Sequence, residues 1–150
     1  MKAQRIMTLK VTCVAPELPL DRAFALMQKL GVRHLPVVAH GQLYGIVSDR
    51  DLLVRGSLND EGKVVLPPRT VGEATSFHPI TCGPSTPVGR IASLMIQHKI
   101  DALPITDPHG KLVGLVTSTD LLRLLESNDD PESATLPFSF ELSSETSLPQ

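Results

Sequence analysis

The sequence predicts an α+β fold of two β-α-β-β-α units, related by a pseudo-twofold axis and packed through their sheets. Three observations predict it: an internal repeat, apolar residues at helical spacing, and a hairpin signal in each repeat. Residues 19–38 align with 87–106 at a shift of 68, and 40–53 align with 109–122 at a shift of 69. The one added residue falls in a turn, where insertions are tolerated. Units this small, about 50 residues, rarely fold alone, so each should bury its sheet against the other.

Each unit is expected to begin with an extended segment followed by a helix. The extended segments are 10–14 and 79–82. The helices open with Pro19 and Pro87 at their first positions, where a missing amide hydrogen costs nothing. Thr86 is a good N-cap for the second of these helices. Gly31 is expected to end the first one, because glycine readily adopts the left-handed conformation of a helix C-terminus.

A β-hairpin and a second helix complete each unit. The dipeptide His-Gly marks the hairpin turns at 40–41 and 109–110. The second helix then begins at Ser48 in the first unit and at Thr117 in the second.

The repeat also sets the expected domain boundaries. The first unit occupies 1–62, with its core at 7–54 followed by a linker, and the second unit occupies 63–126. The C-terminal tail, 127–150, is acidic, rich in serine and interrupted by prolines, so disorder is its default interpretation. Its segment LPFSFEL, 136–142, is an alternative candidate for docking on a sheet edge or on a second copy of the chain.

Composition argues against several classes of function. The net charge is −2 and aromatic residues make up 3%, which disfavours nucleic acid as a partner. No apolar run approaches the roughly 20 residues that span a bilayer, and the start lacks a signal-peptide core, so a cytoplasmic protein without membrane contact is expected. Cys13 and Cys82 have no metal-ligand spacing, so no metal site is expected. The absence of a phosphate-binding loop and of a nucleophile elbow predicts that the chain is not an enzyme.

A twin motif carries the chemistry. Ser48-x-x-Asp51 and Thr117-x-x-Asp120 each follow a glycine-led apolar run. One interpretation is a capping box, worth about 1 kcal/mol per helix and requiring no ligand. The other is recognition of a sugar, because a carboxylate accepts two hydrogen bonds from a vicinal diol. Both are compatible, since a carboxylate has two oxygens.

The motif, the Leu-Pro strand before it and the duplication together resemble a pair of cystathionine-β-synthase-type (CBS) domains, also called a Bateman module, over about residues 7–125. The resemblance implies that Asp51 and Asp120 bind the ribose of an adenine nucleotide, with Ser48 and Thr117 beside them. It places the adenine against the first strands and the Leu-Pro strands, whose residues have plain core packing as the alternative. These adenine-pocket candidates are Val11, Thr12, Cys13, Pro36, Ile80, Thr81, Cys82 and Pro104.

Three basic residues are candidates for binding phosphate. Arg33, His98 and Lys99 resemble basic ligands in energy-sensing members of the family, such as the regulatory subunit of the AMP-activated kinase. For His98 and Lys99 the alternative is that they complement the dipole of the helix that they end. Asp101 stands where Arg33 does in the other unit, so the two clefts need not bind equally.

The resulting hypothesis is a regulatory sensor that binds AMP, ADP or ATP, or S-adenosylmethionine or another adenosyl ligand, without a metal. Ligand binding between the units would alter the activity of a partner protein or the oligomeric state. The family resemblance further implies a homodimer formed through helices. The alternative is a dimerisation or docking module that binds no nucleotide.

Overall fold

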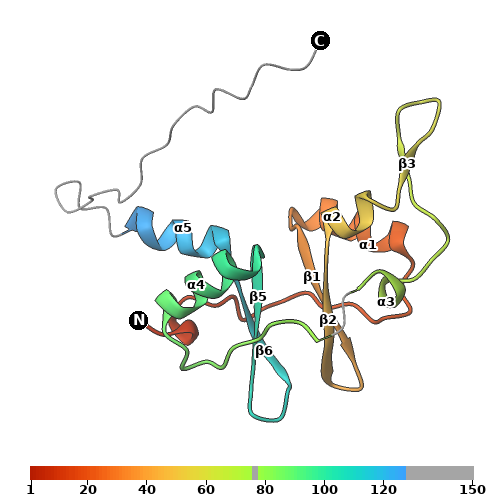
Figure 1. Cartoon of the computed structure of the whole chain (residues 1–150). Coiled ribbons are helices and arrows are strands. Elements are labelled where there is room, and N and C mark those ends of the chain that lie inside the picture. Colours follow the sequence, from red (N-terminus) through yellow and green to blue (C-terminus); the bar gives the residue numbers. More distant parts are fainter. Residues whose placement is uncertain (76–77, 128–150) are drawn as a thin grey trace.

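Two antiparallel hairpins lie side by side at the centre of the computed structural model (Figure 1), which describes residues 1–75 and 78–127. In the first hairpin β1 (His34–Ala39) pairs with β2 (Gln42–Ser48). In the second, β5 (Ala102–Thr106) pairs with β6 (Leu112–Thr117). Both hairpins turn at the predicted His-Gly positions, and the chain has the predicted α+β fold of two related units.

The extended segment before each first helix contacts the hairpin of its own unit through a single β-bridge. Val14 forms a parallel bridge with Val37, and Cys82 forms the corresponding parallel bridge with Ile105. Each hairpin also has a register irregularity directly after the bridged residue of its first strand. The two units therefore match even in the position of the register irregularity in each hairpin.

Two helices accompany each hairpin in the predicted order. These are α1 (Leu20–Leu30) and α2 (Asp49–Leu53) in the first unit, and α4 (Val88–His98) and α5 (Ser118–Ser127) in the second. Gly31 ends α1 in the left-handed conformation, as predicted, with φ of 66°.

The predicted cap at Thr86 is wrong. Pro87 is the N-cap residue of α4, and no side chain caps that helix. The first amide of the helix, at Val88, donates instead to the carbonyl oxygen of Met1 at 3.0 Å. In the first unit Leu20 likewise donates to a distant carbonyl, that of Arg69, at 3.0 Å. Backbone from the start of the opposite unit thus satisfies the first donor of each helix, which at Val88 a local side chain was expected to assist.

The expected linker contains a small hairpin of its own. β3 (Ser57–Leu58) pairs with β4 (Val64–Val65). The side-chain oxygen of Asn59 accepts hydrogen bonds from the amides of Glu61 and Lys63, at 3.0 and 2.9 Å. Asparagine side chains commonly hold turns in this way.

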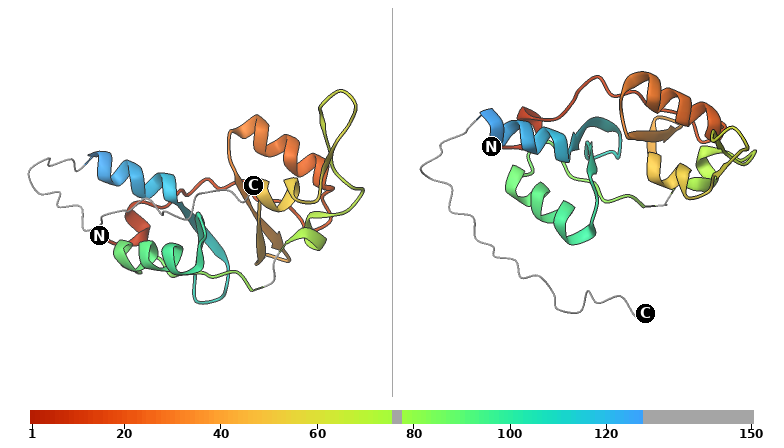
Figure 2. Two further views of the ribbon diagram at one scale, coloured as in Figure 1. Left: turned by 45° about the horizontal axis from the view of Figure 1, so that its top comes forward. Right: turned by 90° about the horizontal axis from the view of Figure 1, so that it is seen from above.

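The two units exchange their first turns. The 3-10 turn η1 (Ala3–Arg5) lies against the second unit, where its first amide donates to the carbonyl of Thr86 at 2.8 Å. The short helix α3 (Val71–Ala74) lies against the first unit, where its first amide donates to the carbonyl of Leu18 at 2.8 Å. Figure 2 shows η1 beside α4 and α5, and α3 beside α1 and α2. Each unit is therefore completed by chain that precedes the other.

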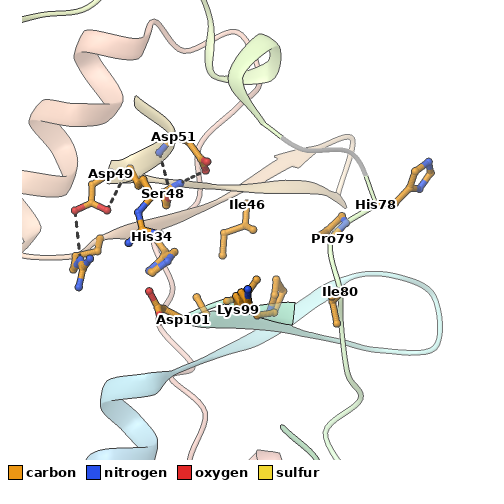
Figure 3. Close-up of a pocket in the computed structure, with 15 residues that line it drawn as sticks. His34, Ile46, Ser48, Asp49, Asp51, His78, Pro79, Ile80, Lys99 and Asp101 are labelled. Atoms are coloured by element: carbon orange, nitrogen blue, oxygen red, sulfur yellow. Dashed lines mark hydrogen bonds and ion pairs between the residues drawn. The ribbon is translucent and has the colours of Figure 1, made fainter. Parts of the chain in front are cut away.

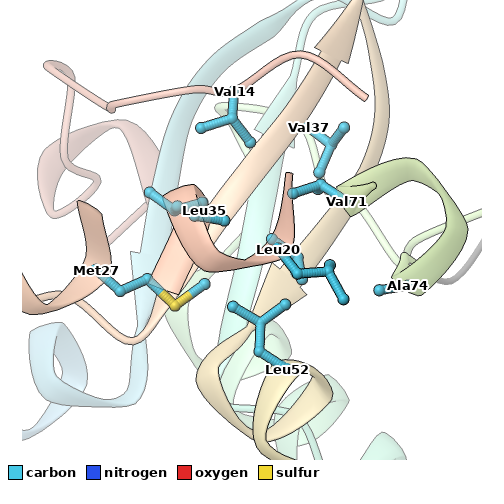
Figure 4. Packing of buried hydrophobic residues seen from close by; sticks show 10 residues of the cluster. Val14, Leu20, Met27, Leu35, Val37, Leu52, Val71 and Ala74 are labelled. Carbon is cyan, nitrogen blue, oxygen red and sulfur yellow. The ribbon is translucent and has the colours of Figure 1, made fainter. Parts of the chain in front are cut away.

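The exchange reaches the hydrophobic cores. Val71 and Ala74 of α3 belong to the core of the first unit (Figure 4), and Ala3 of η1 belongs to the core of the second. The remaining buried residues of the first core are Val14, Leu20, Ala23, Met27, Leu35, Val37, Val47 and Leu52. Those of the second core are Ile91, Met95, Leu103, Ile105 and Val116. Leucine, valine, alanine and methionine build both interiors, and isoleucine adds to the second, as expected from a sequence without tryptophan.

Across 1–75 and 78–127, no helix has the length and apolar character needed to cross a bilayer. The predicted tail, including LPFSFEL, lies from residue 128 onward outside the described residues.

Candidate functional site

The two units enclose two clefts, one at each copy of the twin motif. The first cleft, of about 350 Å³, is lined by 33–34, 46 and 48–51 from the first unit and by 78–80, 99–102 and 104 from the second (Figure 3). The second cleft, of about 430 Å³, is lined by 8, 10–12 and 30–35 from the first unit and by 101, 115, 117–120 and 123 from the second. Both volumes lie within the range of small-molecule sites, roughly 300–1,000 Å³.

The first motif forms a complete capping box at the start of α2. Ser48 has extended backbone at the end of β2, with φ of −106° and ψ of 162°. Its hydroxyl accepts from the amide of Asp51 at 3.1 Å, and Oδ2 of Asp51 accepts from the amide of Ser48 at 2.8 Å. The strand-to-helix transition therefore holds the carboxylate in one orientation.

The second motif repeats this arrangement at the start of α5. Oδ2 of Asp120 accepts from the amide of Thr117 at 2.8 Å and from its hydroxyl at 3.1 Å. The amide of Asp120 donates to Oγ1 of Thr117 at 3.3 Å. The capping interpretation of the twin motif is thus confirmed for both copies.

Capping occupies only one oxygen of each carboxylate. Oδ1 of Asp51 and Oδ1 of Asp120 have no hydrogen-bond partner among the described residues. Both side chains belong to half-buried residues that line a cleft. One oxygen of each motif is therefore left to accept hydrogen bonds from a molecule in the cleft.

Arg33 lies at the border between the clefts and lines both of them. Its Nε is 3.4 Å from Oδ2 of Asp49, and its side chain is 66% exposed. Its carbonyl accepts from the amide of Asp49 at 2.9 Å, just as the carbonyl of Asp101 accepts from the amide of Ser118 at 2.8 Å. Asp101 and Ser118 therefore occupy the places of Arg33 and Asp49 in the second unit.

The two basic residues at the end of α4 have different positions. Lys99 lines the first cleft, whereas His98 lines neither. Lys99 ends α4 in the left-handed conformation with φ of 54°, at the position that Gly31 occupies in the first unit. This conformation costs an L-residue about 1–2 kcal/mol relative to right-handed backbone, so Lys99 occupies this position against a local backbone preference.

The structure divides the adenine-pocket candidates. Val11 and Thr12 line the second cleft, and Ile80 and Pro104 line the first. The candidates that line neither cleft are Cys13, Pro36, Thr81 and Cys82. Pro36 is fully buried within β1, and Cys82 packs against the core of the second unit.

The sequence interpretation missed cleft residues that only the fold brings together. Lys10 and Arg123 line the second cleft. Arg123 follows Asp120 by three residues on a helix, a spacing that places both on one face and could have indicated it. His34 lines both clefts. Burial lowers the pKa of His34 below its usual value, while the nearby carboxylate of Asp101 acts in the opposite direction.

In the part of the chain that the structure describes, no three His, Cys, Asp or Glu side chains gather as potential metal ligands. The clefts instead combine a carboxylate, several basic side chains and apolar walls, which are the groups that bind a sugar, an anion and a flat ring.

Comparison with known proteins identifies the class that this fold and these clefts define. The CBS domain model matches residues 3–56 and 71–127, so the chain belongs to the CBS domain family as a tandem pair, as the sequence indicated. It is 34% identical over 128 residues to the CBS domain-containing protein YhcV of Bacillus subtilis, covering 85% of this chain and 88% of that protein. It is 31% identical to an inosine-5'-monophosphate dehydrogenase of Korarchaeum cryptofilum, but spans only 23% of that enzyme.

Solved structures of CBS pairs have the same fold. CBSX2 in complex with AMP is 29% identical, with a TM-score of 0.71 over 85% of this chain and 97% of that one. The CBS pair of protein MJ0100, in complex with 5'-methylthioadenosine and S-adenosyl-L-methionine, is 27% identical, with a TM-score of 0.70 over 86% and 98%. CBS pairs of this fold therefore include proteins with adenosine-containing ligands.

Proposed function

We propose that the chain is a regulatory module that binds an adenine nucleotide, AMP, ADP or ATP, in the clefts between its two units. Asp51 and Asp120 accept hydrogen bonds from the ribose hydroxyls through Oδ1. Arg33 and Lys99 contact the phosphates. Binding alters how the two units pack, and this change alters a partner protein's activity or the oligomeric state.

The observation that carries the proposal is the division of labour within each carboxylate. Oδ2 of Asp51 holds the start of α2, and Oδ2 of Asp120 holds the start of α5. Because those contacts fix each side chain, Oδ1 meets a ligand without losing further rotamer freedom. Two copies of this arrangement line two clefts of suitable volume.

The relatives support the ligand class and the regulatory role. The solved structure of CBSX2 is a complex with AMP, and that of the CBS pair of protein MJ0100 is a complex with 5'-methylthioadenosine and S-adenosyl-L-methionine. The chain matches 23% of an inosine-5'-monophosphate dehydrogenase and 88% of YhcV, so similar CBS pairs occur both inside larger enzymes and in proteins of about this size. We infer that the chain regulates rather than catalyses, and that S-adenosylmethionine is the alternative ligand.

A dimerisation or docking module without nucleotide is the second candidate function. The observation in its favour is that both capping boxes are complete without a ligand. The exposed apolar side chains Ile96, Leu122 and Leu125, on α4 and α5, support a homodimer formed through helices under either function. Sedimentation velocity with and without nucleotide measures whether the oligomeric state responds.

Thermal unfolding with and without AMP, ADP, ATP or S-adenosylmethionine separates the two functions. A ligand at 100 times its Kd stabilises the folded state by about 2.7 kcal/mol, which raises the Tm by several degrees. The double variant Asp51→Asn/Asp120→Asn should lose this shift. Each asparagine keeps a carbonyl oxygen for the cap but removes the negative charge that strengthens hydrogen bonds from the ribose.

The matched control is Asp21→Asn. Asp21 is also an acidic residue in the first turn of a helix, α1, but it lines neither cleft. This variant should retain the full ligand-dependent shift. If no adenosyl ligand moves the Tm of the wild-type protein, the docking module is the correct interpretation.

A further inference from the structure

The two clefts are not separate, because they share part of their walls. Arg33, His34 and Asp101 line both clefts. Arg33 and Asp101 occupy equivalent positions just before β1 and β5, as their matching hydrogen bonds to Asp49 and Ser118 show. The pseudo-twofold arrangement therefore brings one cation and one carboxylate to the border where the clefts meet.

Each of the other lysine and arginine residues that line the clefts lines only one of them. Arg50 and Lys99 line the first cleft, and Lys10 and Arg123 line the second. Among the described residues, Arg33 is thus the single arginine that lines both clefts. It is paired with Asp49, on the side of the first cleft.

One guanidinium offers a planar set of donors that matches one phosphate at a time. When a phosphate in one cleft engages Arg33, a phosphate in the other cleft has lost that partner. It still faces the carboxylate of Asp101, which lines both clefts. Two phosphate groups beside the same border also repel each other, most strongly at low ionic strength.

We propose that the two clefts compete for Arg33, so that a phosphorylated ligand in one cleft weakens the binding of a second phosphorylated ligand in the other. This proposal rests on the nucleotide binding proposed above. A ligand with the same base and ribose but no phosphate does not need Arg33. Such a ligand binds the two clefts independently. The phosphate, not the nucleoside, carries the coupling.

Isothermal titration calorimetry with AMP and with adenosine tests this proposal. Asp120→Asn leaves only the first cleft functional and Asp51→Asn leaves only the second, so these variants give the intrinsic Kd of each cleft. In the wild-type protein the second AMP should bind at least about fivefold more weakly than its intrinsic Kd, at the lower end of typical coupling. The two adenosine sites should match their intrinsic values.

Three arginine variants identify the shared residue. Arg33→Gln should weaken AMP binding in both single-cleft backgrounds and bring the coupling factor in the wild-type background to one. Arg50→Gln should affect only the first cleft, and Arg123→Gln only the second. These two controls remove the same charge from residues that line a single cleft.

Several results would overturn the proposal while leaving nucleotide binding intact. A wild-type AMP isotherm equal to the sum of the two single-cleft isotherms excludes coupling. Equal coupling with adenosine excludes the phosphate as its cause. An effect of Arg33→Gln on one cleft only, or a single-cleft variant that binds no AMP, excludes a shared cation between two sites. If the wild-type protein binds neither AMP nor adenosine, the proposed function itself fails and the coupling falls with it.

Discussion

The Nε atom of Arg33 lies 3.4 Å from Oδ2 of Asp49 beside the first cleft, whereas Asp101 and Ser118 stand at the corresponding positions of the second unit. The arginine side chain is 66% exposed and that of Asp49 is 28% exposed, so the ion pair adds at most about 1 kcal/mol to stability. Under the proposed function, we expect this ion pair to affect ligand binding. Asp49 competes with any anionic group that approaches Arg33 from the first cleft.

Asp49→Ser, which copies Ser118, should therefore strengthen AMP binding in the first cleft. Removal of the competing carboxylate frees Arg33 and lowers the negative charge of the lining. We expect the Kd to fall by a factor on the order of three to ten, corresponding to about 0.7–1.4 kcal/mol. Calorimetry in the Asp120→Asn background measures it. The reverse change, Ser118→Asp, should weaken AMP binding in the second cleft. Weaker AMP binding in the first cleft of Asp49→Ser would contradict this role of Asp49.

Lys99→Gly should separate stability from binding. Glycine relieves the left-handed backbone at the end of α4, worth about 1–2 kcal/mol, but loses more chain entropy, about 0.5–1 kcal/mol. The free energy of unfolding in urea should therefore stay constant or rise by about 1 kcal/mol. AMP binding in the first cleft should weaken several-fold, because the cation is gone. Unchanged binding would mean that Lys99 only ends its helix.

The stability of the protein should depend on the protonation of His34. Burial lowers the pKa of this imidazole in the folded state, although Asp101 and Asp49 oppose the shift. The unfolded chain, with a histidine pKa of about 6.5, then takes up the proton more readily than the folded protein. The contribution of His34 is present above pH 6.5 and declines as the pH falls from there towards the lower folded value.

Urea unfolding at several pH values between 5.5 and 7.5 measures this dependence. His34→Gln should show a flatter stability profile over that interval than the wild-type protein. His109→Gln, a change at an exposed turn residue, is the control and should keep the wild-type slope. If the free energy of unfolding depends on pH equally in His34→Gln and in the wild type, groups other than His34 cause the loss of stability at low pH.

Gly114→Ala should destabilise the protein through the N-terminal segment. A Cβ atom at this position would lie 2.6 Å from Sδ of Met7 and 3.2 Å from its Cβ, so the side chain of Met7 has to shift. Overpacking of this kind typically costs about 1–3 kcal/mol, measured as a lower free energy of unfolding. The double variant Met7→Ala/Gly114→Ala should recover part of the loss. A double variant less stable than the sum of its single changes would show that the contact is not the cause.

Local patterns predicted the parts of this protein that depend on local physics. Gly31 ends α1 because glycine tolerates the left-handed conformation, and Ser48 with Asp51 forms the capping box that its spacing indicates. The duplication predicted the pairing of hairpins and helices. These features need only a few neighbouring residues, and the repeat shows each pattern twice.

The missed features depend on contacts between residues far apart in the chain. Thr86 carries a suitable side chain for a cap, yet the carbonyl of Met1 accepts from the first amide of α4. Lys10 reaches the second cleft only because two units pack around it, and His34 reaches both clefts for the same reason. No local spacing in the sequence indicates these long-range contacts. The two motifs could therefore be predicted, whereas the cleft residues that the other unit contributes could not.

The exchanged turns have a consequence for how the chain is made and folded. Residues 1–7 leave the ribosome well before the carbonyl of Thr86 and the strand that contains Gly114, which are synthesised some 80 to 110 positions later. Contacts this distant in sequence slow folding, because a long loop has to close before they form. The interior of the first half includes Val71 and Ala74, and that of the second half includes Ala3, so a fragment that ends before residue 70 would leave the Leu20 region uncovered. The two units therefore depend on each other for folding. A cut at the boundary between them, after residue 62, would remove α3 from the first core and η1 from the second, and so destabilise both units.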